Sequence, residues 1–544
     1  MEINEVAMDF NGYKDYLLSY LEEYRQAEKN ELEKIQQLSE SEKEDKGYAI
    51  LDAIVVAQDD DFAELMVKRN FSKWRLGDKV ICKEVSNSNF VATVIENFAD
   101  RIVLSDVKEL QIGCSINLYS YQSELTGIII GAIESVQEGG TGSNYLDILG
   151  GISAPKIASP LPLKVDSNLC DGLNEKQKEA AERIFNRPSI YAIQGPPGTG
   201  KTNVLATIAQ AYSKKGKSVL VISNSHQAVN NALNKIGERH VPTYKVGSSY
   251  KTQALIDQVV QCESMREYKI KSNHSRKNRV NNGDILGMTL YGAIINMITH
   301  SSDFAPAIVL VDEASQIPLV MGASIAKLGA GTIVFIGDEI QMPPIFLDEI
   351  QNHELSISIF EYLQKILPSE LKTTLTTTYR MNKVICEFVS KRYYEPYGIS
   401  LYSFDGIADR HVQSEKIENS VEEIIVNSDG CLDSNELEAQ KAVELAKHYI
   451  IQGLEVAIIS PYRKQVNCVL NAWEAVNSDG ELLVDTVERL QGQDVDVIII
   501  TMSCSDESYY ASQKDFLLNA NRLNVMISRA KQKVIIIKSK SIDI

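Results

Sequence analysis

The chain has 544 residues and an ordinary apolar content, enough for several domains with buried cores. Its formal net charge of −18 excludes a broad basic surface for nucleic acid, although a narrow channel of positive potential stays compatible with it. No run of 18 or more apolar residues occurs, so we expect no membrane-spanning helix.

The eight cysteines are scattered along the chain and form no Cys-x-x-Cys pair. This spacing argues against a zinc site and against a disulfide framework. Free thiols suit a reducing compartment, and we therefore expect the protein in the cytoplasm.

Residues 1–68 are predicted to form an acidic, helical N-terminal segment. Residues 1–64 alone hold 18 acidic and 6 basic residues. A long helix is expected over residues 11–46, where apolar residues recur mostly every three or four positions, and a second helix over residues 47–67. The helix either packs on its own protein by one stripe or forms an arm that binds a protein partner. The stripe consists of Leu17, Leu21, Tyr24, Leu32, Ile35 and Leu38.

Residues 69–150 are predicted to form a small β-barrel. Short β-rich runs are separated here by glycine and asparagine turns, which is typical of such barrels. The runs cover residues 79–84, 90–96, 102–105, 115–119 and 127–136. Three prolines within residues 151–172 indicate a linker.

An alternation of strands and helices over residues 173–345 predicts a mostly parallel sheet. Its expected strands are residues 189–193, 218–223, 285–289, 307–311 and 332–336. A polar insertion, residues 245–282, interrupts the pattern and carries a basic cluster. The cluster is either a solvated loop or a contact for nucleic acid. Its members are Arg266, Lys269, Lys271, Arg276, Lys277 and Arg279.

A connector, residues 346–370, leads to a second alternating unit, residues 371–544. Its expected strands are residues 423–426, 455–460, 482–486, 496–501 and 533–537. Helices are expected at residues 434–451, 463–476 and 519–531. The fold class is therefore α/β, with two sheets, a small β-barrel accessory domain and an N-terminal helical segment.

A phosphate-binding loop is predicted between the first strand and the first long helix of the first unit. Glycines let backbone N–H groups turn around a polyphosphate, and the helix N-terminus adds partial positive charge. Lys201 is placed to reach the terminal phosphates, and the Thr202 hydroxyl to hold Mg²⁺. The loop Gly-x-x-x-x-Gly-Lys-Thr comprises Gly195, Pro196, Pro197, Gly198, Thr199, Gly200, Lys201 and Thr202. The sequence thus predicts a protein that uses a nucleoside triphosphate.

Two carboxylates, Asp312 and Glu313, follow a buried strand of the same unit. In P-loop enzymes an aspartate at such a strand end holds Mg²⁺, and the glutamate beside it can activate the attacking water. Phosphoryl transfer also needs positive charge on the transition state, for which Arg380 and Arg529 in the second unit are candidates. They complete the site if the two units face each other across the nucleotide; otherwise each is a surface arginine.

Several stretches, in order, resemble the motifs of superfamily 1 helicases, in the subgroup that contains the nonsense-mediated-decay RNA helicase. The resemblance covers roughly residues 70–544 and rests on residues 173–177, 195–202, 219–232, 312–316, 337–344, 379–381, 486–494 and 522–530. It implies that Gln177 contacts the adenine, that Tyr379 stacks on it, and that Asp494 reaches towards the ribose. It also implies contacts of Gln341 and Arg380 with the γ-phosphate, with Arg529 as the second arginine. Strand contacts are implied at Ser225, Thr289 and Thr486.

The same resemblance implies two RecA-like domains with ATP and Mg²⁺ between them and single-stranded DNA or RNA across their top. The barrel is then the accessory domain that contacts nucleic acid, and the motor moves 5′ to 3′. Two alternatives stay open. One is an ATP-driven remodeller of nucleoprotein that separates no duplex, and the other is an ATP-switched binding partner recruited through residues 1–64.

Overall fold

The computed structural model describes residues 8–59, 62–72, 74, 78–84, 89–98, 100–121, 125–247, 255–272, 283–299, 306–476, 482–488, 490 and 494–542. Within these ranges no helix has the length and apolar character that crossing a membrane requires. The chain divides into two compact units. One comprises Met1–Leu21, Ile128–Gly247 and Ala254–Ile544, and the other Glu22–Gly127 and Ser248–Gln253.

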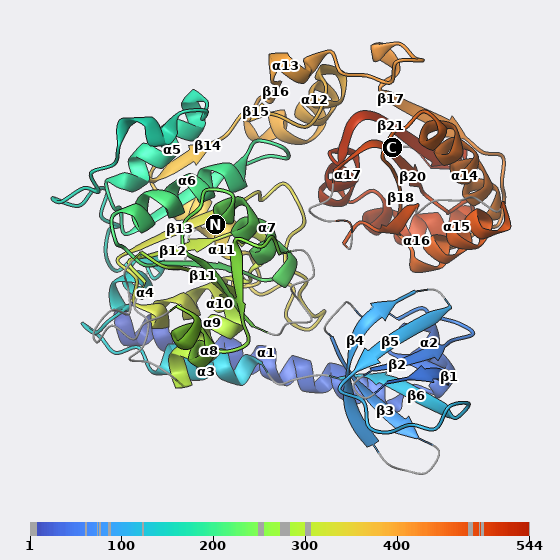
Figure 1. The fold of residues 1–544 in the computed structure, drawn as a ribbon, viewed down its shortest axis with the longest axis horizontal. Helices are drawn as coiled ribbons and strands as arrows, with labels where there is room; N and C mark the ends of the chain where they lie inside the picture. The colour runs from blue at the N-terminus through green and yellow to red at the C-terminus, as the bar shows by residue number, and fades with distance from the viewer. Residues whose placement is uncertain are drawn as a thin grey trace. The chain divides into compact units, whose positions relative to one another are not determined.

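The smaller unit is built around a closed barrel of six strands in the order β1-β2-β5-β4-β3-β6 (Figure 1). All the pairings are antiparallel, and β1 closes the barrel on β6. Alternate residues such as Val80 and Cys82 point inward, as a half-buried strand requires. The strands are Ala49–Gln58, Phe62–Met66, Lys79–Glu84, Asn89–Asn97, Arg101–Ser105 and Ser115–Ser120.

Two predictions about this region are wrong. Residues 47–67 form strands β1 and β2 rather than a helix, and the alternating burial of Ala53 and Val55 explains why. The run predicted as a strand at 127–136 is largely helix α3, Thr126–Glu134. A short, continuous apolar run fits a buried strand or a buried helix equally well, so its period could not decide. The barrel strands therefore span residues 49–120 and not the predicted 69–150.

Helix α1, Phe10–Gln37, begins in the larger unit. Its residues Phe10, Tyr13, Leu17 and Tyr20 are buried at spacings of three or four. Lys14 Nζ donates to the Glu134 carbonyl at 2.7 Å, which ties the helix to the end of α3. Of the predicted stripe, Leu17, Leu21 and Tyr24 are buried, which confirms packing on its own protein for this part of the helix. Leu32, Ile35 and Leu38 are partly exposed.

The larger unit contains an eight-stranded sheet, all parallel, in the order β10-β9-β11-β8-β12-β13-β7-β14. Its central strands are continuous apolar runs buried on both faces, as a parallel sheet between helices requires. The strands, β7 to β14, are Ile190–Gln194, Val219–Ser223, Thr243–Val246, Val259–Cys262, Ile285–Thr289, Ile308–Val311, Thr332–Gly337 and Lys372–Thr374. Helices α5 to α9 are Glu175–Phe185, Lys201–Lys214, His226–Gly237, Met265–Lys271 and Leu290–Thr299; α10 and α11 are Leu319–Ala323 and Ile359–Ile366.

The limits of this sheet differ from the prediction at two places. Residues 245–282 were expected to interrupt the sheet. Instead, β10 lies within them and pairs with β9 as the edge strand, and helix α8 follows it. At the other edge, β14 pairs with β7, so the first sheet takes residues up to 374 although the second unit was expected from 371. Of the basic cluster, α8 carries Arg266, Lys269 and Lys271, and the other three members lie outside the described residues.

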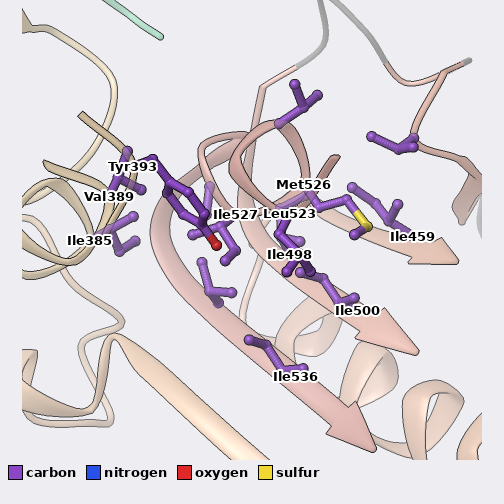
Figure 2. Packing of buried hydrophobic residues seen from close by; sticks show 14 of the residues in the cluster. Ile385, Val389, Tyr393, Ile459, Ile498, Ile500, Leu523, Met526, Ile527 and Ile536 are labelled. Atoms are coloured by element: carbon purple, nitrogen blue, oxygen red, sulfur yellow. The ribbon is translucent and has the colours of Figure 1, made fainter. Parts of the chain in front are cut away.

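The second sheet has five parallel strands in the order β17-β21-β20-β18-β19. Alternate residues of β20 belong to two cores. Ile498 and Ile500 pack with helices α12 and α17 (Figure 2). Val497 and Ile499 pack with α14 and α15. The strands, β17 to β21, are Val421–Ile425, Val456–Ser460, Leu483–Thr486, Val495–Thr501 and Ala530–Lys538. The helices α12, α14, α15, α16 and α17 are Lys383–Val389, Glu436–Ile451, Arg463–Ala475, Glu507–Leu517 and Ala520–Ile527.

A short segment precedes the second sheet. Strand β15, Thr377–Thr378, pairs with β16, Tyr402–Ser403, and a π-helical turn, Ser390–Tyr394, continues α12. Two helix-covered parallel sheets, a closed barrel and an N-terminal helix confirm the predicted α/β class with two RecA-like domains.

Candidate nucleotide site

The predicted phosphate loop joins β7 to α6. Gly198 and Gly200 have φ of +72° and +79°, in the left-handed region that glycine adopts without strain. A Cβ on Gly195 would lie 2.2 Å from Lys201 Cγ, so this position admits no side chain. Lys201 Nζ donates to the Gly195 carbonyl, which folds the lysine back over the loop. The loop thus presents an ammonium group beside the N-terminus of a long helix, an arrangement suited to an anion.

The loop is held by groups from outside it. Gln177 Nε2 donates to the Thr199 carbonyl at 2.8 Å, while its Oε1 accepts from the Asn174 backbone N–H in a capping box at 3.0 Å. On another side, Thr378 Oγ1 donates to the Pro197 carbonyl at 3.0 Å. Gln177, expected to contact adenine, therefore anchors the loop in this structure, a role that the sequence did not indicate. Its contact with a base stays a prediction.

Tyr379 leads from β15 towards the loop and is 38 % exposed. Its backbone N–H donates to the Gly198 carbonyl at 2.8 Å, and its hydroxyl accepts from Asn174 Nδ2 at 2.9 Å. The ring centroid of Phe404 lies 5.0 Å from that of Tyr379. The two rings form an exposed aromatic platform beside the phosphate loop. Phe404 escaped the sequence analysis because the pairing of β15 with β16 has no local signal.

Asp312 and Glu313 follow β12, as predicted. Asp312 is buried, and its pKa is raised to about 7 by desolvation and by the negative charge of Glu313, against the opposing effect of Lys201. Lys201 and Asp312 thus act on each other electrostatically. Glu313 has φ of +52°, unusual for a residue with a side chain, and such backbone conformations concentrate at functional sites.

Gln341 lies just beyond β13, next to a buried carboxylate. Its Nε2 donates to Asp338 Oδ2, and Gln194 Nε2 of β7 donates to Asp338 Oδ1, each at 2.6 Å. Burial raises the pKa of Asp338, and the charge of Lys201 opposes that shift. Gln341, the predicted contact of the γ-phosphate, therefore shares Asp338 with Gln194, the last residue of the strand that leads into the phosphate loop.

Of the two predicted arginines, Arg529 is buried and Arg380 is half-buried, so neither is a fully exposed surface residue. Arg380 donates to Asp494 Oδ1 at 2.8 Å and to the Ser528 carbonyl at 3.0 Å. Arg529 is buried, and its pKa is lowered to about 10 by desolvation and by the charge of Arg380, with Glu313 and Asp494 opposing the shift. The buried Nε atoms of both arginines have no hydrogen-bond acceptor within the described part of the chain. Asp494, expected near the ribose, here pairs with Arg380.

The three predicted strand contacts lie at the carboxyl ends of parallel strands. Ser225 follows β8 and caps α7, Thr289 ends β11, and Thr486 ends β19. Ligands of such sheets bind at this edge. The Gln-Gly-Gln part of the fifth motif, residues 491–493, lies outside the described residues. No group of three or more histidine, cysteine, aspartate or glutamate side chains that could hold a metal occurs in the ranges described.

Comparison with known proteins gives matches on both sheets. Two family models, each described as an AAA domain, match residues 172–351 and residues 355–541. The DNA replication ATP-dependent helicase/nuclease DNA2 of Xenopus laevis is 28% identical over 420 residues, which cover 70% of this chain and 38% of the relative. The protein of the same name from Saccharomyces cerevisiae is 27% identical over 407 residues, 68% of this chain and 26% of the relative.

The chain thus spans less than two fifths of the length of these relatives. Among solved structures, the helicase nonstructural protein 10 of Arterivirus aligns with a TM-score of 0.42 at 16% identity, over 88% of this chain and 77% of that one. The AAA-domain matches and the helicase relatives place the nucleotide site in a known class. These matches support the predicted resemblance to the superfamily 1 helicases, in the 5′-to-3′ subgroup similar to the nonsense-mediated-decay RNA helicase.

Proposed function

We propose that this protein uses ATP to move 5′ to 3′ along single-stranded nucleic acid and to displace a paired strand. One observation carries the proposal. Residues 379 and 380 join the phosphate loop to the start of β21 in the second sheet. The Tyr379 backbone N–H donates to the Gly198 carbonyl at 2.8 Å, and Arg380 donates to the carbonyl of Ser528, next to Arg529, at 3.0 Å. A site completed by two sheets changes when they move apart, and this is how hydrolysis becomes motion.

The residues fit a bound triphosphate. Two guanidinium groups repel each other, and burial strengthens that repulsion. Their unpaired, buried Nε–H groups are donors suited to a phosphate oxygen, and a polyanion beside Lys201 offsets the excess positive charge. The exposed rings of Tyr379 and Phe404 offer a surface for the base.

Thr202 and Asp312 would hold Mg²⁺. A hydroxyl at the start of α6 and a carboxylate at the end of β12 are oxygen donors of the kind that this ion prefers. When bound, Mg²⁺ neutralises charge on the β- and γ-phosphates. The lack of a larger acidic cluster among the described residues fits an ion that is shared with the substrate's phosphates.

The roles of the remaining groups follow from their chemistry. Glu313 orients the attacking water and accepts its proton. Lys201, Arg380 and Arg529 stabilise the negative charge that develops on the transferred phosphoryl group, and Gln341 contacts its oxygens. Ser225, Thr289 and Thr486 contact the strand through its phosphates, so binding does not depend on base sequence.

The first experiment measures ATP hydrolysis with single-stranded DNA and RNA of the same sequence, beside the inactive control Lys201→Ala. The two helicase relatives are named for DNA replication, so we expect DNA to stimulate at least as well as RNA. A duplex with a 5′ overhang should be unwound, and the same duplex with a 3′ overhang should not. Absence of stimulation by either strand contradicts the motor, and preference for the 3′ overhang contradicts its polarity. Stimulated hydrolysis without unwinding would favour the nucleoprotein remodeller.

A further inference from the structure

Asp338 is a buried carboxylate that receives donors from two parts of the molecule. From the first sheet, it accepts hydrogen bonds from Gln194, from Gln341 and from the Ile340 backbone N–H. A further donor, Tyr394 Oη, comes from the π-helical turn at 390–394 and lies 2.5 Å from Asp338 Oδ2. Asp338 is 1 % exposed. A buried charge persists only where several donors satisfy it, so each of these bonds affects its position.

Tyr394 and Gln341 donate to the same oxygen. Both bonds end on Asp338 Oδ2, the one from Gln341 at 2.6 Å. The Gln341 carboxamide has two N–H hydrogens, and committing one to Asp338 fixes the directions of the other hydrogen and of the carbonyl oxygen. Loss of the Tyr394 hydroxyl would leave Asp338 Oδ2 with one hydrogen-bond donor fewer, so its negative charge would be less well satisfied and its position less well fixed. The orientation of Gln341 therefore depends on Tyr394 through the Asp338 oxygen that both side chains share.

Tyr394 is in turn held by the second sheet's helix α17. Asn524 Nδ2 donates to Tyr394 Oη at 3.0 Å and to the Ile340 carbonyl at 2.9 Å. Asn521, one turn earlier, donates to the Glu339 and Gln341 carbonyls. Helix α17 thus contacts the whole segment 339–341 that follows β13, and the chain reaches Arg529 two residues after the helix ends.

The hydrophobic core explains why this chain of bonds is stiff. Tyr394 and Asn524 are both fully buried, and Tyr394 belongs to the cluster that α12 and α17 form against β20 and β21. Figure 2 shows the neighbouring Tyr393 and Val389 lying towards Ile527 of α17 in this cluster. A movement of the second sheet therefore carries α17 and Tyr394 together.

We propose that Tyr394 and Asn524 are positioning residues for ATP hydrolysis, which set the orientation of Gln341 through Asp338 according to where the second sheet stands. Arg529 and a correctly turned Gln341 then reach the γ-phosphate in the same closed state, and neither acts in the open state. This proposal rests on the proposed function, because it requires that Gln341 contact the nucleotide.

The test is a double-mutant cycle between Tyr394→Phe and Gln341→Ala. Tyr394→Phe removes one oxygen and keeps the packed ring. We expect it to lower kcat for strand-stimulated hydrolysis about tenfold, the loss of one oriented contact in the transition state, with KM for ATP changed less than about twofold. In the Gln341→Ala background, Tyr394→Phe should lower kcat no further. Asn524→Ala, as a second variant, should show the same dependence on Gln341.

Tyr393→Phe is the matched control, because it removes a hydroxyl from an equally buried neighbour that does not bond to Asp338. It should keep kcat, and Tyr394→Phe should still unfold in a single cooperative thermal transition, which shows that its loss of kcat is not a loss of fold. Full kcat in Tyr394→Phe, or losses that add in the double variant, would overturn the positioning role. If the wild-type protein showed no strand-stimulated hydrolysis, the proposed function itself would be wrong, and the positioning role of Tyr394 and Asn524 would fall with it.

Discussion

The two parallel sheets differ at the turn that leads from a strand into the first long helix that follows it. In the first sheet, β7 leads into α6 through a glycine loop, and no side chain of the described residues caps the N-terminus of α6. In the second, β17 leads to α14, whose N-terminus is already occupied by its own protein. Asn435 Oδ1 accepts from the backbone N–H groups of Leu437 and Glu438, at 3.1 and 3.2 Å.

Beside that cap lies a buried carboxylate. Glu438 accepts from the Ser503 backbone N–H at 2.8 Å and from Asn435 Nδ2 at 3.3 Å. In the part of the chain that the structure describes, the N-terminus of α6 thus has no side-chain cap, whereas Asn435 caps that of α14. This difference fits the proposal that the first sheet binds the phosphates and that the second contributes Arg529.

The largest effect is expected from changes to the groups that the first sheet contributes to the nucleotide site, in the β7–α6 loop and after β12. Lys201→Ala and Glu313→Gln should each abolish strand-stimulated hydrolysis, a loss of at least about a thousandfold, since each removes a group that acts on the transferred phosphoryl. Binding of an ATP analogue should survive in Glu313→Gln and weaken in Lys201→Ala, which fluorescence titration can measure. Normal turnover in Glu313→Gln would remove its assignment as the group that activates water.

The next effect concerns the contribution of the second sheet. Arg529→Ala should lower kcat by about a thousandfold, in the range known for arginines that act on a γ-phosphate. Arg529→Lys keeps the charge but loses the planar fork, and should recover only part of that loss. Steady-state kinetics with saturating single strand measure both. Wild-type kcat in Arg529→Ala would show that the first sheet completes the chemistry alone.

A third prediction addresses the carboxylate at α14. Burial raises the pKa of Glu438 to about 8 from its ordinary 4.5, so the folded protein keeps a proton that the unfolded chain releases. Stability from this proton is full below about pH 4.5 and is lost as pH rises through about 8. Over that window the wild type should lose on the order of a few kcal/mol in the free energy of unfolding, seen as a falling thermal midpoint. Glu438→Gln should remove most of this fall.

The matched control for this prediction is Glu436→Gln, an exposed carboxylate in the first turn of the same helix. Its curve of thermal midpoint against pH should follow that of the wild type. If Glu438→Gln also followed the wild type between about pH 5 and 8, the carboxylate would be ionised in the folded protein, and the raised pKa of Glu438 would be wrong.

More of the first sheet's site than of the rest of the molecule could be predicted from local sequence. The phosphate loop and Asp312 could be predicted because glycine spacing and a strand end are properties of a few neighbouring residues. The strands at 49–66 were missed because residues 47–67 were predicted as a second helix of the acidic N-terminal segment. Tyr394 and Asn524 had no local signal at all. Their meeting requires residues 130 positions apart to pack in one core, and one sequence shows no such pairing.

The smallest expected effect is at the aromatic platform. Tyr379→Ala should raise KM for ATP about tenfold, since stacking of a base on an aromatic ring is worth about 1–3 kcal/mol and this ring is partly exposed. It should leave kcat nearly unchanged, because the base is remote from the transferred phosphoryl. Tyr379→Phe keeps the ring and loses only the bond to Asn174, so its KM should stay within about threefold of the wild type. A Tyr379→Ala protein with wild-type KM would show that the base lies elsewhere, and Phe404→Ala, measured in the same assay, would then locate it.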